Sequence, residues 1–174
     1  MTARFNIRDL AADEADAFGR LLVAVYSGLT GFPSIQEQPA YYDMLMRVGD
    51  FARRDGARVL VAVSPHAELL GGVVYFGNMA EYGSGGSATR IRNASGIRLL
   101  GVSPAARGQG TGKALTQACI DLARAGGACR SHPAHHPGDA DSVAPVSGAR
   151  LRPFAGSGFP PGGSTGVWIP PAPR

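Results

Sequence analysis

The sequence predicts an α+β domain in which a mostly antiparallel sheet is flanked by helices. β-Branched runs of strand length lie in the middle of the chain, and apolar residues recur at helical spacing before and after them. A chain of 174 residues with 44% apolar residues also suits a single core. We therefore expect one domain over residues 1–174.

The first elements are a short strand followed by two helices. Alternating residues at Phe5–Ile7 predict the strand, and Asp9 is placed to cap a helix whose apolar face runs from Phe18 to Val25. A second apolar stripe with helical spacing runs from Tyr41 to Phe51. Both helices thus precede the main part of the sheet.

The middle of the chain predicts three strands and a long helix. The runs Arg58–Ser64 and Glu68–Phe76 are separated by a Pro-His-Ala turn, which is typical of an antiparallel hairpin. After a Gly/Ser-rich connection, Gly96–Val102 reads as another strand. From Ser103 the chain turns into a helix with one apolar face between Leu115 and Ala123.

Composition excludes several functional classes. The longest apolar stretches are about eight residues, whereas a membrane-spanning helix needs about 20. The net charge of +4 comes from scattered arginines without interleaved aromatic residues, which argues against a nucleic-acid surface. The start of the chain lacks the pattern of a secretory signal, and Cys119 and Cys129 have neither metal-ligand nor disulfide spacing. We expect a cytoplasmic protein with no metal and with neither membrane nor nucleic acid as a partner.

A glycine-rich turn between the last strand and the long helix carries the chemistry. In GVSPAARGQGTGKAL, the residues Gly108, Gly110 and Gly112 let the backbone approach a ligand closely at a helix N-terminus. Free N–H groups and about half a positive charge from the helix dipole converge there. Arg107 and Lys113 add full charges, so the turn favours a phosphate or pyrophosphate.

Two familiar phosphate-binding patterns do not fit this turn. A Walker loop needs Gly and Ser or Thr where this chain has Arg107 and Ala114. The dinucleotide fingerprint GxGxxG needs Gly where Lys113 or Leu115 stands, and it follows a first parallel strand rather than a late one.

The pattern that remains is [Q/R]xxGx[G/A], met by Arg107, Gly110 and Gly112 after a strand that ends in Leu-Gly-Val. It resembles the GNAT superfamily of N-acetyltransferases that use acetyl-coenzyme A, and the element order matches over a core at residues 3–125. The resemblance implies a GNAT-like fold. It also implies that the loop holds the pyrophosphate of acetyl-coenzyme A and that the strand backbone orients the thioester. The residues concerned are Leu100, Gly101, Val102, Arg107, Gly108, Gln109, Gly110, Thr111, Gly112 and Lys113.

The implied reaction is direct acetyl transfer to an amine of a small molecule or peptide, with a base, N–H donors for the oxyanion and an acid for the thiolate. The strand GIRLLGV has no carboxylate, unlike relatives that place a Glu there. Deprotonation of the amine then goes through water or through a group elsewhere in the chain, for which Glu81 and Tyr82 are candidates. The alternative reading of both is that they are solvated loop residues. A rival function is a non-catalytic acyl-coenzyme A binding protein or an inactive remnant. The chain is also a candidate for a homodimer.

The segment from residue 126 to residue 174 departs from the family. It holds 9 Gly, 9 of the 13 Pro and three of the four His, and it offers almost no apolar face to offset the entropy cost of ordering. We expect C-terminal elements that are missing or irregular. No fifth strand, no fourth helix with AxxLYxxxGF and no closing strands are predicted, so the edge of the fourth strand is left unpaired.

A shifted reading frame explains this departure. Codons for His132–Ala140, read from the second base, can encode ILHTTQAM, a strand typical of the family. The same reading of Asp141–Arg152 permits RIAWRLYRELGF, which contains AxxLYxxxGF in register. We therefore predict that the frame slips near Gly126–Cys129 and that the aberrant tail at residues 126–174 is not a selected sequence.

Overall fold

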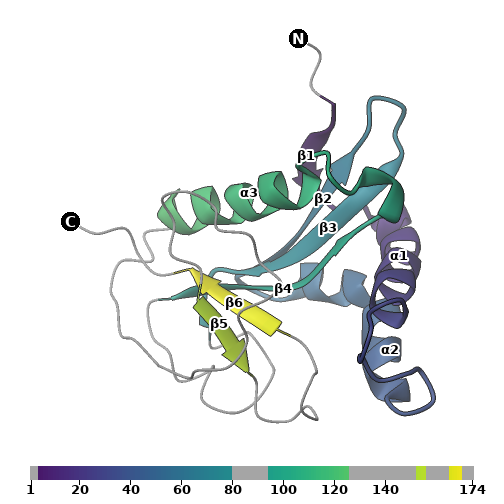
Figure 1. Cartoon of the computed structure of the whole chain (residues 1–174). Helices are drawn as coiled ribbons and strands as arrows, with labels where there is room; N and C mark the ends of the chain where they lie inside the picture. Colours follow the sequence, from purple (N-terminus) through teal and green to yellow (C-terminus); the bar gives the residue numbers. More distant parts are fainter. Residues whose placement is uncertain (1–3, 80–93, 126–151, 156–164, 170–174) are drawn as a thin grey trace.

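The computed structural model describes residues 4–79, 94–125, 152–155 and 165–169 (Figure 1). Its strands are β1 (Asn6–Asp9), β2 (Ala57–Val63), β3 (Leu69–Phe76), β4 (Ser95–Val102), β5 (Arg152–Ala155) and β6 (Thr165–Ile169). Its α-helices are α1 (Ala15–Ser27), α2 (Pro39–Met46) and α3 (Thr111–Ala125). Short 3₁₀ helices are η1 (Ala12–Glu14), η2 (Val48–Arg53) and η5 (Pro104–Ala106).

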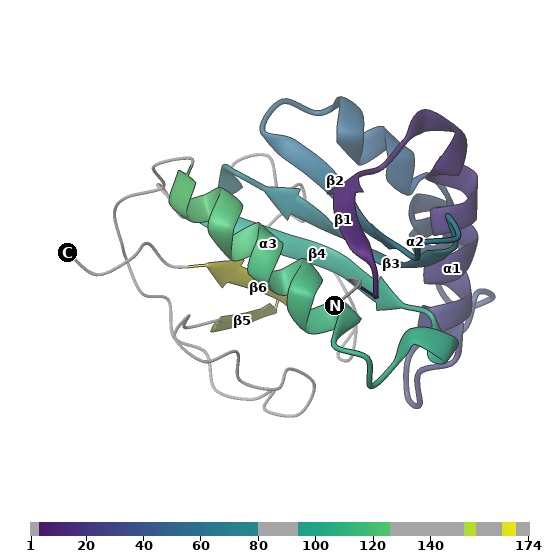
Figure 2. The same cartoon turned by 90° about the horizontal axis from the view of Figure 1, so that it is seen from above.

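The strands form one sheet in the order β1-β2-β3-β4-β6-β5, and every neighbouring pair is antiparallel. Helices α1 and α2 cover one face of the sheet and α3 crosses the other (Figures 1 and 2). This architecture confirms the predicted α+β class with an antiparallel sheet flanked by helices.

Strand β2 shows why its sequence is a continuous apolar run. Val59, Val61 and Val63 pack with α1 and α2, whereas Leu60 and Ala62 pack with α3. Since successive side chains of a strand point to opposite faces, a strand covered on both faces needs apolar residues at nearly every position. The predicted hairpin is confirmed, because β2 and β3 pair antiparallel.

The first helix does not begin as predicted from Asp9. Asp9 lies in β1, where its carboxylate accepts hydrogen bonds from Arg58 Nε at 2.9 Å and Arg58 Nη2 at 2.5 Å. These hydrogen bonds lower the pKa of Asp9. The helical segment instead starts with η1, where Glu14 accepts the N–H of Ala11 at 3.0 Å. The pairing of β1 with β2 therefore keeps Asp9 extended.

The second predicted helix is divided into α2 and η2. The backbone leaves the helical region at Arg47, with φ −94° and ψ 29°. Helix α1 approaches this break closely, because a Cβ added at Gly19 would lie 2.4 Å from the carbonyl oxygen of Met46. The division lets Val48 and Phe51 join the core beside α2.

The prediction that the tail has no strands and that the edge of β4 is unpaired is wrong. Strand β6 pairs with β4 through Ser95 to Ile97, and β5 pairs with β6 (Figure 2). The segment Thr165–Ile169 contains a local Val-Trp-Ile run with high strand propensity, which the Gly/Pro-rich average of the tail concealed. The other predicted features of the tail fall mostly outside the described residues.

Within the described residues, no helix is long and apolar enough to cross a membrane.

Candidate functional site

The glycine-rich turn lies where β4 leads into α3. After Val102 the chain forms η5, and the turn at residues 107–110 brings it to the start of α3. Gln109 Nε2 donates a hydrogen bond to the carbonyl of Ala105 at 2.9 Å, and Thr111 Oγ1 donates to the carbonyl of Ala106 at 3.4 Å. These two bonds tie the turn back onto η5 and fix its course.

Two glycines of the turn adopt backbone conformations that L-residues rarely take. Gly108 has φ +74° and Gly110 has φ +83°. A Cβ at either position would meet no atom within 4 Å, so conformation rather than crowding is what requires glycine there. The space that a side chain would take at these two positions is therefore open.

The turn presents a row of unused amide donors. Among the described residues, no backbone hydrogen bond is donated by the N–H groups from Gly108 to Lys113, and the first to bond back into the helix is Ala114, to Gly110 at 2.9 Å. The exposed side chains of Arg107 and Lys113 stand at the two ends of this row. A helix N-terminus with free amides and two nearby cations can bind an anion, and it suits a diphosphate.

A β-bulge in β4 sets the direction of the side chains that approach the turn. Gly72 pairs with Gly101 and Val74 pairs with Arg98, so Val73 lies opposite the two residues Leu99 and Leu100. Leu99 has φ +54°, which costs roughly 1–2 kcal/mol for a residue other than glycine. Bulges of this kind re-aim side chains and are frequent beside functional sites.

The bulge changes the alternation of faces along β4. Arg98 and the adjacent Leu99 both contact the α1 and α2 side. From there the alternation resumes with the opposite phase, and Leu100 and Val102 pack on the α3 side. Val102 consequently lies next to the start of α3, where a Cβ added at Gly112 would lie 3.5 Å from Val102 Cγ2.

The structure brings the predicted binding residues together at one end of β4. The last residues of the strand, Leu100 to Val102, and the turn up to Lys113 form one continuous stretch. The N–H of Ser103 donates to the carbonyl of Leu70 at 2.8 Å, which anchors the strand end to β3. Glu81 and Tyr82, the candidate catalytic residues, lie outside the described residues.

Two residues that bear on chemistry were either set aside or missed by the sequence analysis. Cys119 is buried on α3, and burial raises the pKa of its thiol to about 12, so it is a core residue and no nucleophile. Arg98 is buried on β4 with only 4% of its surface exposed. A charged residue in an otherwise apolar strand was the signal that could have found it.

Within the described ranges, no group of three or more His, Cys, Asp or Glu side chains is placed to hold a metal ion.

Comparison with known proteins points to acetyltransferases. The family model described as "Acetyltransferase (GNAT) family" matches residues 22–138, which is more than half of the chain. No curated protein sequence matches the chain.

Solved structures share the fold at low sequence identity. One from Corynebacterium glutamicum, titled histone acetyltransferase HPA2 and related acetyltransferase, is 14% identical, covers 99% of both chains and has a TM-score of 0.59. A GNAT-family acetyltransferase from Staphylococcus aureus is also 14% identical, over 68% of this chain and 66% of that one, with a TM-score of 0.50. A glucosamine N-acetyltransferase region in a fungal multi-domain β-N-acetylglucosaminidase is 21% identical, over 87% of this chain and 18% of that one, with a TM-score of 0.52. At these identities the likeness concerns the fold.

Proposed function

The chain belongs to the GNAT family of acetyltransferases, and from this premise we propose that it transfers an acetyl group from acetyl-coenzyme A to the amine of an acceptor. The observation that carries the proposal is the row of amide donors at the start of α3, which opens onto free space at Gly108 and Gly110. An anion of the size of a diphosphate fits such a row, and the family supplies the identity of that anion.

The binding residues are proposed as two groups. The turn from Arg107 to Lys113 holds the diphosphate through its N–H groups, and its two cations add charge. Hydrogen bonds to a charged partner contribute about 1.5–3 kcal/mol each, so two or three of them give substantial affinity. The backbone of Leu100 to Val102 orients the thioester arm, because the pairing of β4 with β6 ends at Ile97 and these residues lie beyond it.

Acetyl-coenzyme A, when bound, supplies an electrophilic thioester carbonyl. The acceptor nitrogen forms the new C–N bond, the C–S bond breaks, and one proton passes in net from the amine to the departing sulfur. N–H groups of the chain near the end of β4 are proposed to stabilise negative charge on the carbonyl oxygen. Glu81 and Tyr82 remain the proposed candidates for taking the proton from the amine, and water is the alternative route for that proton.

The test is to incubate the purified chain with acetyl-coenzyme A and a panel of amines while thiol release is followed. Release that depends on the amine supports the acetyltransferase. Binding of coenzyme A by calorimetry without release for any amine supports the rival, a non-catalytic acyl-coenzyme A binding protein or an inactive remnant. Absence of binding contradicts both the acetyltransferase and the acyl-coenzyme A binding protein and leaves the inactive remnant.

The tail is a separate part of the proposal. We keep the hypothesis that the reading frame slips near Gly126–Cys129 and that the family-like core is at residues 3–125. The family model itself matches as far as residue 138. Sequencing this part of the gene decides between the two frames. An acceptor screen on the written chain and on a frame-restored version measures how much acetyltransferase activity is lost with the present tail. A cytoplasmic location and a homodimer also remain predictions.

A further inference from the structure

Gln109 lies between the two glycines of the turn that adopt positive φ. Gly108 has φ +74° and Gly110 has φ +83°, and neither position has a side chain that could pack against the rest of the protein. Glycine also loses more conformational freedom on ordering than any other residue. The course of the turn, and with it the direction of its N–H groups, therefore depends on a restraint other than side-chain packing at these two positions.

The side chain of Gln109 provides such a restraint. Its Nε2 donates a hydrogen bond to the carbonyl oxygen of Ala105 in η5 at 2.9 Å, the usual separation for a bond between these atom types. The acceptor is itself held in place, since the adjacent Ala106 is buried and the N–H of Ser103 donates to the carbonyl of Leu70 in β3 at 2.8 Å. The hydrogen bond of Gln109 thus joins the middle of the turn to a fixed part of the fold.

The donors that this turn offers to an anion are main-chain groups. Among the described residues, no backbone hydrogen bond is donated by the N–H groups of Gly108, Gln109 and Gly110, so these three groups remain for a ligand. A site whose donors are already in place loses less conformational entropy when its ligand binds, and its affinity is higher for that reason. A restraint on the turn in the free protein should therefore strengthen the binding of the diphosphate.

We propose that Gln109 is a positioning residue for coenzyme A. Its side chain does not hold the diphosphate. Instead, its hydrogen bond to Ala105 keeps the N–H groups of the turn in the arrangement that the diphosphate binds. The proposal rests on the acetyltransferase function, and it gives Gln109 a different role from that of a residue that touches the coenzyme with its side chain.

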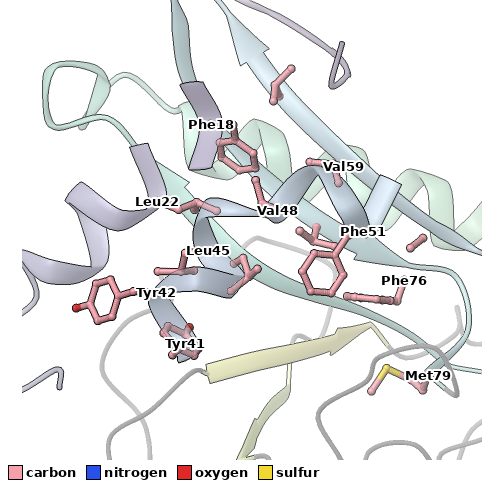
Figure 3. Packing of buried hydrophobic residues seen from close by; sticks show 14 of the residues in the cluster. Phe18, Leu22, Tyr41, Tyr42, Leu45, Val48, Phe51, Val59, Phe76 and Met79 are labelled. Atoms are coloured by element: carbon pink, nitrogen blue, oxygen red, sulfur yellow. The ribbon is translucent and has the colours of Figure 1, made fainter. Parts of the chain in front are cut away.

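This hydrogen bond should serve binding while contributing little to the stability of the domain. Buried apolar clusters on the two faces of the sheet stabilise the fold, and Figure 3 shows the cluster on the α1 and α2 side, with Phe18, Leu22 and Phe51. Gln109 is exposed and belongs to neither cluster. Substitution of an exposed residue of this kind should change Tm by no more than about 2 °C.

Gln109→Met tests the proposal, because methionine has a similar length and no donor. Calorimetry of coenzyme A into the full chain should show an affinity about 2- to 10-fold lower than that of the native chain, the range that one hydrogen bond between neutral groups accounts for. Backbone ¹⁵N relaxation of the chain without ligand provides the second measurement. The order parameters of Gly108 and Gly110 should be about 0.85 in the native chain, as in rigid backbone, and should fall below about 0.6 in the variant.

The matched control is Gln117→Met. Gln117 lies on α3, and its Nε2 donates a hydrogen bond to Asp121 Oδ1 at 3.0 Å, so the same change removes a similar bond outside the turn. This variant should keep both the affinity for coenzyme A and the order parameters of the turn.

Four results would overturn the proposal. Weaker binding by Gln109→Met with unchanged order parameters would mean that the side chain contacts the ligand directly. Greater motion of the turn with unchanged affinity would mean that the hydrogen bond does not serve binding, and no change in either measurement would mean that it has no role. A fall in Tm well beyond 2 °C would assign Gln109 to the stability of the fold. Failure of the native chain to bind coenzyme A would instead refute the acetyltransferase function, on which the proposal rests.

Discussion

At Gly112, a single substitution should affect the stability of the fold and the binding of a ligand in opposite directions. It lies in the first turn of α3 with a negative φ, and a Cβ there would meet only Val102 Cγ2, at the ordinary contact distance of 3.5 Å. The fold therefore does not require glycine at this position. Because alanine is favoured over glycine in a helix by up to about 1 kcal/mol, Gly112→Ala should stabilise the free protein by roughly 0.5–1 kcal/mol. In a domain of this size that raises Tm by about 1–4 °C.

The same substitution should weaken the binding of coenzyme A. The added methyl group would lie 3.5 Å from Val102 Cγ2, between the start of α3 and the end of β4, beside the amide donors proposed to hold the diphosphate. A loss of about 10-fold in affinity, or roughly 1.4 kcal/mol, is expected if the diphosphate must move away from even one N–H group. Thermal unfolding with and without coenzyme A, together with calorimetry, measures both effects on one variant.

Gly110→Ala is the matched comparison, since its φ of +83° makes alanine unfavourable there by roughly 1–2 kcal/mol although no atom is in the way. It should lower both stability and affinity. The reasoning about the site is refuted if Gly112→Ala binds coenzyme A as tightly as the native chain. An effect on stability alone would mean that this glycine has no role toward a ligand.

Three further predictions concern the fold. Ala67, in the turn between β2 and β3, has φ +63°, so Ala67→Gly should raise the free energy of unfolding in urea by about 0.5–1 kcal/mol, and a decrease would contradict the assigned turn. The carboxylate of Asp9 has its pKa lowered by hydrogen bonds from Arg58, so its contribution to stability is complete above the unfolded value of about 3.9 and is lost as pH falls through the folded pKa. Asp9→Asn should flatten the stability profile in that acidic range, and an unchanged profile would count against the pair. Cys119, with a thiol pKa of about 12, should resist a thiol reagent at about pH 8 in a Cys129→Ser background until the protein is unfolded, whereas rapid labelling of the native protein would show that the site opens.

The sequence alone predicts those elements whose local residue pattern agrees with their packing in the fold. The hairpin of β2 and β3 was predictable because both strands are buried on both faces and so read as continuous apolar runs. The turn from Arg107 to Lys113 was predictable for a similar reason. Positive φ at Gly108 and Gly110 is a local requirement, and the spacing of the glycines in the sequence shows where it applies.

Features that depend on long-range pairing were not predictable in this way. The bulge at Leu99 has no local sequence signal, because Leu-Leu is equally compatible with a regular strand, and it exists only through the register between β3 and β4. Strand β6 was missed since its five residues become a strand only by pairing with β4 and β5. The role of Asp9 was misassigned because its partner Arg58 is distant in sequence.

The bulge sets which face of the sheet each residue at the end of β4 takes. In a regular strand, residues two apart share a face, so Arg98 and Val102 would both face α1 and α2. With one extra residue opposite Val73, Arg98 keeps that face while Val102 turns toward α3 and Gly112. A single irregularity therefore allows one strand to direct Arg98 toward α1 and α2 and Val102 toward the start of α3. Deletion of Leu100 would remove the extra residue opposite Val73 and leave Arg98 and Val102 three positions apart, so that both side chains keep their present faces in a regular strand. We therefore expect calorimetry to show that the deletion variant still binds coenzyme A, whereas a complete loss of binding would mean that the bulge itself is needed at the site.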